Sequence, residues 1–182
     1  MKKGFTLIEL LVVIAILAVL MSVVVVTINP AEMLKKTRDT KRISDLDALR
    51  TALNLYLTDQ QLFTDTSCRA SQVGAPTIGT CTSTIGSTSQ SPSGNWTSID
   101  FTKISSGSPL STIPLDPKNA TTSVNTTTYA YYFKSNAASS TFTLLCNMES
   151  SYYSNGAGTT DVESKDGGNQ ADFYEVGSAM LF

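Results

Sequence analysis

The sequence predicts an α+β protein in which a long amino-terminal helix packs on a small antiparallel β-sheet. Three patterns lead to this prediction. Residues 10–28 form a run of 19 residues with no side chain more polar than Ser22 or Thr27. Residues 31–60 carry apolar side chains at three- and four-residue steps, and residues 129–146 place aromatic and β-branched side chains on both sides of a polar loop. The first two patterns are typical of helices, and the third is typical of a β-hairpin.

The apolar run has the length of a membrane-spanning helix. Nineteen residues extend about 28 Å as an α-helix, which matches the hydrocarbon core of a bilayer. In lipid every backbone polar group needs an internal partner, so the run must be helical there, although residues 23–26 favour a strand in water. Lys2 and Lys3 precede the run, and no A-x-A-like cleavage site follows it. Hydropathy alone therefore leaves an uncut signal anchor as one interpretation.

Glu9 is the unusual residue of this segment, because a carboxylate inside an apolar run calls for a functional partner. The residues around it, KGFTLIELLVVIAIL at 3–17, resemble the class III signal of type IV pilins and type II secretion pseudopilins. The resemblance implies that a prepilin peptidase cuts between Gly4 and Phe5 on the cytoplasmic side and N-methylates the Phe5 amine. Glu9 would be the assembly carboxylate that meets the amino-terminal nitrogen of a neighbouring subunit, since a buried carboxylate is tolerated when paired.

The same resemblance implies partners and a location. The chain would cross the inner (cytoplasmic) membrane once, with its head outside the cytoplasm, and would then enter an extracellular or periplasmic filament. Its partners would be further copies of itself, the prepilin peptidase and an inner-membrane assembly platform with its ATPase; nucleic acid would be a partner only in a DNA-uptake pilus. We divide the chain into a leader (1–4), an apolar helix (5–28), an amphipathic helix half (29–62) and a head (63–182).

The composition argues against an enzyme. The chain has 182 residues, a net charge of −2 and no histidine, which excludes Ser–His and Cys–His nucleophile pairs. Its three cysteines, Cys68, Cys81 and Cys146, include no C-x-x-C pair. Outside the cytoplasm they would give one disulfide and one odd thiol. A Cys68–Cys81 bond would contribute on the order of 3 kcal/mol by closing its loop, and a bond from either of them to Cys146 stays open.

The predicted second helix half has one irregular start and one apolar face. Pro30 would clash with the carbonyl of Val26, so the helix is kinked or unwound around residues 27–29 if it continues. The apolar stripe predicts packing under the sheet. It consists of Ile43, Leu46, Leu49, Leu53, Tyr56 and Leu57.

The charges on this helix half predict two further properties. Arg42, Asp45 and Arg50 are candidates for ion pairs between subunits, although exposed pairs contribute only about 0–1 kcal/mol each. Five cations just after the apolar run conflict with the positive-inside rule, which by itself would place the head in the cytoplasm. These cations are Lys35, Lys36, Arg38, Lys41 and Arg42.

The head divides into a long connection and a sheet. Residues 64–114 are rich in Ser, Thr, Gly and Pro, which predicts a surface connection. Within it, residues 96–104 are a weak candidate for a strand. Residues 129–134 and 141–146 predict an antiparallel hairpin, and residues 173–176 predict a final strand.

The carboxyl-terminal segment is rich in oxygen ligands. Residues 113–117, followed by Tyr129 and Tyr131, partly resemble the Leu-Pro-x-Asp-Pro and Tyr-x-Tyr stretch of major pseudopilins, although Lys-Asn stands where Trp-Gly is usual. Those proteins carry calcium in a carboxyl-terminal loop, and residues 166–172 look similar. A flexible acidic loop suits calcium, and a solvated acidic turn is the alternative. The candidate ligands are Asp161, Glu163, Asp166 and Asp172.

Three functions follow from these patterns. The first is a structural subunit of a type IV pilus-like filament. The second is a type II secretion major pseudopilin whose head is stabilised by calcium. The third belongs to a different class: an uncut, membrane-anchored extracellular binding module.

Overall fold

The computed structural model describes residues 4–59, 62–81, 84–118 and 129–182, with the backbone alone for 25–28. The chain divides into two compact units, Met1–Lys35 and Lys36–Phe182.

The first unit contains helix α1 (Leu7–Ile28) and the start of helix α2 (Pro30–Thr58). Asn29 separates the two helices in the left-handed conformation, with φ 46°. Pro30 begins α2 because the first position of a helix needs no N–H donor. The interruption expected around residues 27–29 is therefore confirmed. Among the described residues, one helical segment, Leu7–Val24, is long and apolar enough to cross a membrane.

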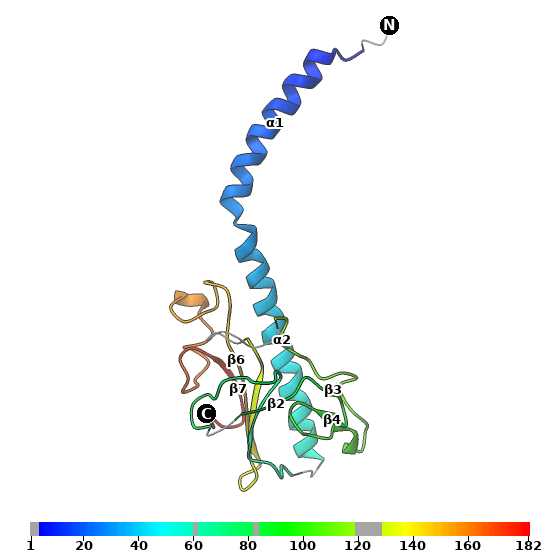
Figure 1. Cartoon of the computed structure of the whole chain (residues 1–182), viewed down its shortest axis with the longest axis vertical. Coiled ribbons are helices and arrows are strands. Elements are labelled where there is room, and N and C mark those ends of the chain that lie inside the picture. Colours follow the sequence, from blue (N-terminus) through cyan, green and yellow to red (C-terminus); the bar gives the residue numbers. More distant parts are fainter. Residues whose placement is uncertain (1–3, 60–61, 82–83, 119–128) are drawn as a thin grey trace. The chain divides into compact units, whose positions relative to one another are not determined.

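The second unit is built on α2 and a five-stranded sheet (Figure 1). In space the strand order is β2-β1-β5-β6-β7. These strands are β1 (Cys68–Ala70), β2 (Thr84–Gly86), β5 (Tyr132–Asn136), β6 (Thr141–Cys146) and β7 (Tyr174–Gly177). A separate hairpin joins β3 (Gln90–Ser91) to β4 (Gly94–Asn95), and two 3-10 turns, η1 (Phe101–Lys103) and η2 (Gly158–Thr160), lie in the connections.

The α+β fold class is confirmed, and so are the predicted hairpin and final strand. β5 pairs antiparallel with β6, and β6 pairs antiparallel with β7. The sheet is mixed rather than purely antiparallel, because β1 pairs parallel with β2. A methyl group at Gly86 in β2 would overlap the carbonyl oxygen of Gln72. The absence of a side chain there lets the two segments approach.

The core lies between α2 and the sheet, as the apolar stripe predicts. Leu46, Leu49 and Leu53 are fully buried, and Phe63 packs edge-to-face on Phe133 and Phe142 with ring centroids 6.0 Å apart. Edge-to-face packing of this kind adds to the free energy gained by burying the rings.

The connection over residues 64–114 contributes to this core, which differs from the prediction of a surface segment. Trp96, Phe101 and Ile113 are fully buried in it. The prediction of a strand over residues 96–104 is wrong, because β4 ends at Asn95 and the chain then turns through η1. Turns, not a regular strand, place the large apolar side chains of this stretch in the core. Turns produce no periodic pattern in the sequence.

Cys68 and Cys81 form a disulfide with their Cα atoms 6.0 Å apart. It links β1 to the segment before β2. Cys146, at the end of β6, is a buried free thiol.

Candidate functional site

The predicted processing site lies in extended chain ahead of α1. Gly4, Phe5 and Thr6 are non-helical and exposed, and 86 % of the Phe5 surface is accessible. A methyl group at Gly4 would meet no atom within 4 Å. The Gly4–Phe5 peptide bond is thus open to a protease.

Thr6 and Glu9 form a capping box at the start of α1. The Glu9 backbone N–H donates to Thr6 Oγ1 at 3.3 Å, and Glu9 Oε2 accepts from the Thr6 N–H at 2.8 Å and from its hydroxyl at 2.7 Å. These bonds satisfy two helix N–H donors that have no partner within the helix. The Thr-x-x-Glu spacing is the signal in the sequence that would have indicated this box. The carboxylate therefore sits three residues along the helix and faces back toward its amino end.

The side chains of α1 that the structure describes are apolar and exposed. From Leu7 to Val24 none of them is buried. Burying a large aliphatic side chain is worth about 1.5–3 kcal/mol, so a helix with this surface requires a non-aqueous surrounding.

A buried ionic cluster holds the second unit together. We call it the Arg42 cluster; its members are Arg38, Asp39, Arg42, Asp116, Lys118 and Glu149. The Arg42 side chain is fully buried and binds Asp116 in a fork, with Nε to Oδ2 at 2.6 Å and Nη2 to Oδ1 at 3.0 Å. Its Nη1 binds Asp39 Oδ1 at 2.6 Å. Two-point binding of this kind is the strongest ion-pair geometry.

Glu149 forms the second half of the cluster. Its carboxylate accepts from Arg38 Nε at 2.7 Å and Nη2 at 2.6 Å, and its Oε1 lies 2.6 Å from Lys118 Nζ. Burial raises the pKa of Glu149, but the bonds from Arg38 and Lys118 outweigh it and hold the pKa at about 2.

Asp39 and Tyr129 connect the two halves. The Asp39 carboxylate accepts from the backbone N–H groups of Glu149 and Ser150, at 2.9 and 2.7 Å. The Tyr129 ring lies 4.8 Å from the Arg42 guanidinium carbon and 4.9 Å from Lys118 Nζ. Three cations thus meet three carboxylates, and one turn of α2 binds the chain at residues 116–118, 129 and 149–150.

The cluster corrects one prediction from the sequence. Arg42 is fully buried, so it forms no ion pair with another subunit. Asp45 is also used inside the head, where it pairs with Lys41 Nζ at 2.8 Å and accepts from the Tyr131 hydroxyl at 2.8 Å. Arg50 is exposed and stays a candidate.

The cluster also bears on the basic stretch that conflicts with the positive-inside rule. Arg38 and Arg42 are neutralised by carboxylates distant in the sequence, and Lys41 by Asp45. Lys35 pairs with Glu32 at 3.2 Å, and Lys36 Nζ lies 4.2 Å from the centre of the Tyr152 ring. The stretch is basic in the sequence and largely neutral once folded.

The candidate calcium ligands do not converge on one point. Asp161 accepts from the N–H groups of Gly156 and Ser164, both at 3.0 Å. Glu163 accepts from the Met148 N–H at 2.6 Å and the Asn155 N–H at 2.8 Å, and burial raises its pKa to about 7 despite these bonds.

The remaining two candidates, Asp166 and Asp172, are also hydrogen-bonded within the chain. Asp166 accepts from the Gly168 N–H at 2.8 Å, and Asp172 Oδ1 accepts from the Asn155 side-chain amide at 3.2 Å. Among the described residues, no three acidic or cysteine side chains gather as a metal site would require. The four carboxylates are hydrogen-bonded to N–H donors of the chain, and calcium binding by them stays a prediction.

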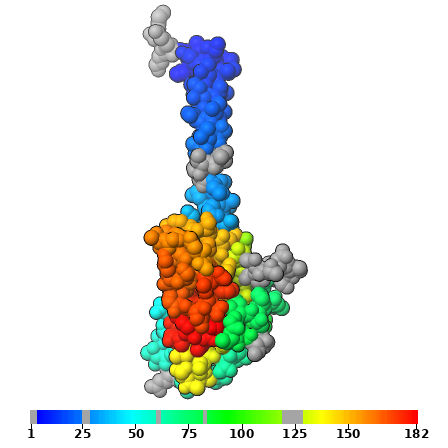
Figure 2. All heavy atoms as spheres, turned by 90° about the vertical axis from the view of Figure 1, so that its left-hand side faces the viewer, coloured from blue at the N-terminus to red at the C-terminus, as the bar shows by residue number. Residues whose placement is uncertain are grey.

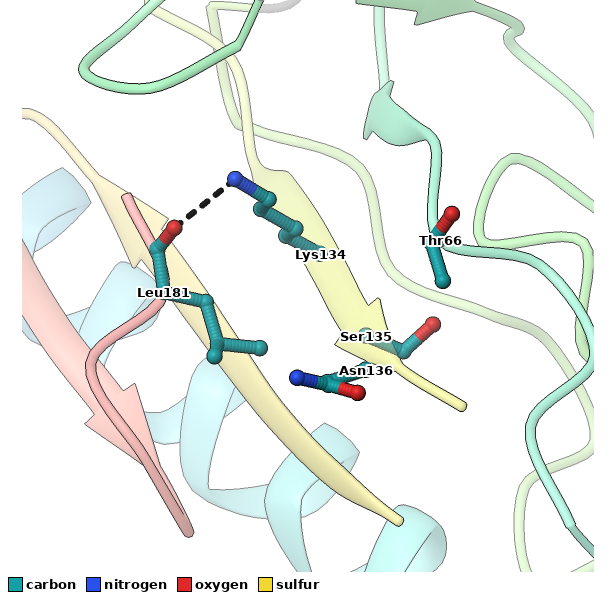
Figure 3. A pocket seen from close by; sticks show the side chains of 5 residues that line it. All are labelled: Thr66, Lys134, Ser135, Asn136 and Leu181. Atoms are coloured by element: carbon teal, nitrogen blue, oxygen red, sulfur yellow. Dashed lines mark hydrogen bonds between the residues drawn. The ribbon is translucent and has the colours of Figure 1, made fainter. Parts of the chain in front are cut away.

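A small pocket of about 300 Å³ lies beside β5 (Figure 3). Thr66, Lys134, Ser135, Asn136 and Leu181 line it. The Lys134 ammonium donates to the Leu181 carbonyl at 2.8 Å, so this cation is already bound to the chain. Burial lowers its pKa.

The amino terminus of the chain matches a known motif. Residues 1–25 match the family model of the prokaryotic N-terminal methylation motif. The chain carries the class III signal of type IV pilins and pseudopilins. This pilin-like signal covers Gly4, Phe5 and Glu9 and includes most of α1. No curated protein and no solved structure matches the chain.

Replacing Arg42 by Met should destabilise the head by about 3–5 kcal/mol, because Asp39 and Asp116 would keep their buried charges without a cation. Arg50→Met is the matched control: it removes the same charge from the exposed face of α2, and a change within about 0.5 kcal/mol is expected. Urea unfolding of the full chain in detergent micelles, followed by Trp96 fluorescence, measures both. Equal losses in the two variants would contradict the structural role of the cluster.

The low pKa of Glu149 predicts acid sensitivity. Since its pKa falls from 4.5 to about 2 on folding, its contribution is complete above about pH 4.5 and disappears as the pH falls toward 2. The free energy of unfolding should decline less steeply in Glu149→Gln than in the parent chain over this range. The same slope in both chains would show that Glu149 is not held ionised by the cluster.

Proposed function

We propose that this chain is a structural subunit of a type IV pilus-like filament. Prepilin peptidase cuts it between Gly4 and Phe5 and methylates the Phe5 amine, and the subunit polymerises through α1. The carrying observation is the combination of the methylation motif over residues 1–25 with a helix that exposes apolar side chains from Leu7 to Val24. Adhesion, motility, DNA uptake and secretion are all roles of such filaments.

The exposed Gly4–Phe5 bond supports the processing step, because a protease must bind extended chain. Before assembly, α1 lies in the inner membrane as a single span, and the head lies outside the cytoplasm. The partners are the peptidase, further copies of the chain and an inner-membrane platform with its ATPase. This orientation also agrees with the basic stretch of α2, because Arg38, Lys41 and Arg42 are paired with carboxylates of the head.

A second candidate is the major pseudopilin of a type II secretion system. It is favoured by residues 113–117, whose Asp116 binds Arg42 in the centre of the head. A periplasmic rather than a surface filament would support it. The candidate from a different class is an uncut membrane-anchored binding module, which has the same α1 but keeps Met1.

Mass spectrometry of the chain from its native membrane separates processing from simple anchoring. We expect a mature chain that begins at Phe5 with one added methyl group. A chain that still begins at Met1 would overturn the filament proposal and favour the binding module.

The capping box allows the charge of Glu9 to be tested apart from its shape. Glu9→Gln keeps an acceptor for the Thr6 N–H, since Gln also completes capping boxes, but removes the charge that would meet a neighbouring amine. Glu9→Val removes both. We expect both variants to enter the membrane at parental levels and neither to form filaments, as judged by shearing and electron microscopy. Filaments of Glu9→Gln at the parental level would show that capping, and not charge, is the role of this residue.

A further inference from the structure

The pocket beside β5 is a feature that the proposed function does not use. Its volume of about 300 Å³ is at the lower end of the range for small-molecule sites. Lys134 and Asn136 line it from one face of β5, because alternate residues of a strand share a face. Phe133, on the other face, packs in the core with α2. The pocket therefore lies on the face of the sheet that points away from α2.

Lys134 is a cation without a carboxylate partner. Its ammonium donates to the Leu181 carbonyl at 2.8 Å and to the Thr80 hydroxyl at 2.5 Å, and both of these acceptors are neutral. None of the ion pairs found in the described part of the chain includes Lys134, although every Asp and Glu lies in that part. Burial lowers its pKa because no opposite charge offsets the loss of water. Since an ammonium has three N–H donors, one is left for a ligand.

Asn136 supplies a second donor. Its side-chain oxygen accepts from the backbone N–H groups of Ala138 and Ser139, at 2.9 and 3.4 Å. These bonds decide which end of the amide is the oxygen. The amide nitrogen of Asn136 and the hydroxyl of Thr66 have no hydrogen-bond partner among the described residues. The residues that line the pocket thus supply one positive charge and unused N–H and O–H donors.

The acidic residue next to the pocket does not neutralise this charge. Asp65 precedes Thr66 in the chain, and its backbone carbonyl accepts from the Ser135 hydroxyl. The Asp65 carboxylate is bound to Arg69, so it is already paired with a cation of its own. The charge of Lys134 is therefore left without a partner, and a half-buried charge in this state favours the binding of an anion.

A ligand can reach the pocket from solvent. Figure 2 shows the carboxyl-terminal segment (red) at the surface of the head, beside the turn between β5 and β6 (yellow). Thr66 is exposed, and Lys134, Asn136 and Leu181 are half-buried. Figure 3 shows these four residues around the pocket.

We propose that the pocket beside β5 binds a small organic carboxylate. The Lys134 ammonium supplies the opposite charge, and the Asn136 amide and the Thr66 hydroxyl supply hydrogen bonds to the oxygens. The methylene stem of Lys134 and the Leu181 side chain are apolar, so they suit a short carbon chain attached to the carboxylate. A single cation matches the single charge of a carboxylate. The site does not depend on polymerisation and goes beyond the proposed function.

The test uses the full chain in detergent micelles at neutral pH, with sodium butyrate as the probe. At about ten times its dissociation constant, butyrate should raise the melting temperature by about 3–6 °C relative to sodium chloride of the same ionic strength. Butyramide has the same shape without the charge and should give no shift. No shift with butyrate, or an equal shift with butyramide, would overturn the proposal. A shift with sodium phosphate but not with butyrate would also overturn it.

Chemical acetylation of lysines, mapped by mass spectrometry, shows where the carboxylate binds. At the same butyrate concentration, acetylation of Lys134 should slow by about tenfold, because only the unoccupied fraction reacts. Lys103 is an exposed lysine of η1 and should react at an unchanged rate. Protection of both lysines to the same degree would contradict a site at Lys134.

Two variants separate the site from the fold. Lys134→Gln removes the charge, and Asn136→Asp keeps the oxygen that accepts from the loop N–H groups but places a negative charge in the pocket. Both should lose the butyrate shift, whereas Lys103→Gln, the matched control, should keep it. A shift that survives in both pocket variants would overturn the proposal. Filament formation by the Glu9 variants is measured separately, so failure here leaves the proposed function standing.

Discussion

The head depends on one buried guanidinium. Arg42 takes its place in the core only because Asp39 and Asp116 surround it, and those carboxylates are tolerated only because Arg42 is there. Glu149 pairs with Arg38 and Lys118 in the same way. The three positive and three negative charges of the cluster therefore neutralise one another within one turn of α2 and the segments that dock on it. A forked Arg–Asp pair aligns two N–H donors with two oxygens, so a shift of this turn would break it. The cluster therefore fixes where the segments at residues 116–118, 129 and 149–150 dock on the helix.

This arrangement explains which parts of the fold are visible in the sequence. The apolar run, the stripe under the sheet and the β5–β6 hairpin are local patterns, and all three predict the correct element. The Arg42 cluster joins residues 74 and 111 positions apart, and no local pattern reports such a pairing. For this reason Arg42 looks like a surface charge in the sequence although it is fully buried, and Asp45 looks like one although it bonds Lys41 and Tyr131 within the head.

The same distinction separates the two candidate sites. Gly4, Phe5, Thr6 and Glu9 are adjacent, and their spacing alone suggests both the processing motif and the capping box. The composition of the acidic loop does not predict where each carboxylate points. Asp161 and Glu163 accept hydrogen bonds from the backbone N–H groups of Ser164 and Asn155. The burial of Glu175 in β7 is not predicted either, because a glutamate in a short strand looks like a solvent-facing residue in the sequence. Short strands such as β1 and β2, with three residues each, also have too few residues to show an alternating pattern in the sequence.

The exposed surface of α1 also determines how the proposed filament would change in length. Each subunit that left such a filament for water would uncover about twenty apolar side chains at once, at about 1.5–3 kcal/mol for each large one, which no aqueous pool of free subunits could support. Subunits would enter and leave only at the end that touches the bilayer, where α1 moves between the apolar filament core and the apolar core of the membrane. Growth and retraction would then share a single end, and the far tip would be chemically inert. A break in the middle would be permanent, because the detached piece could neither shed subunits nor regain them.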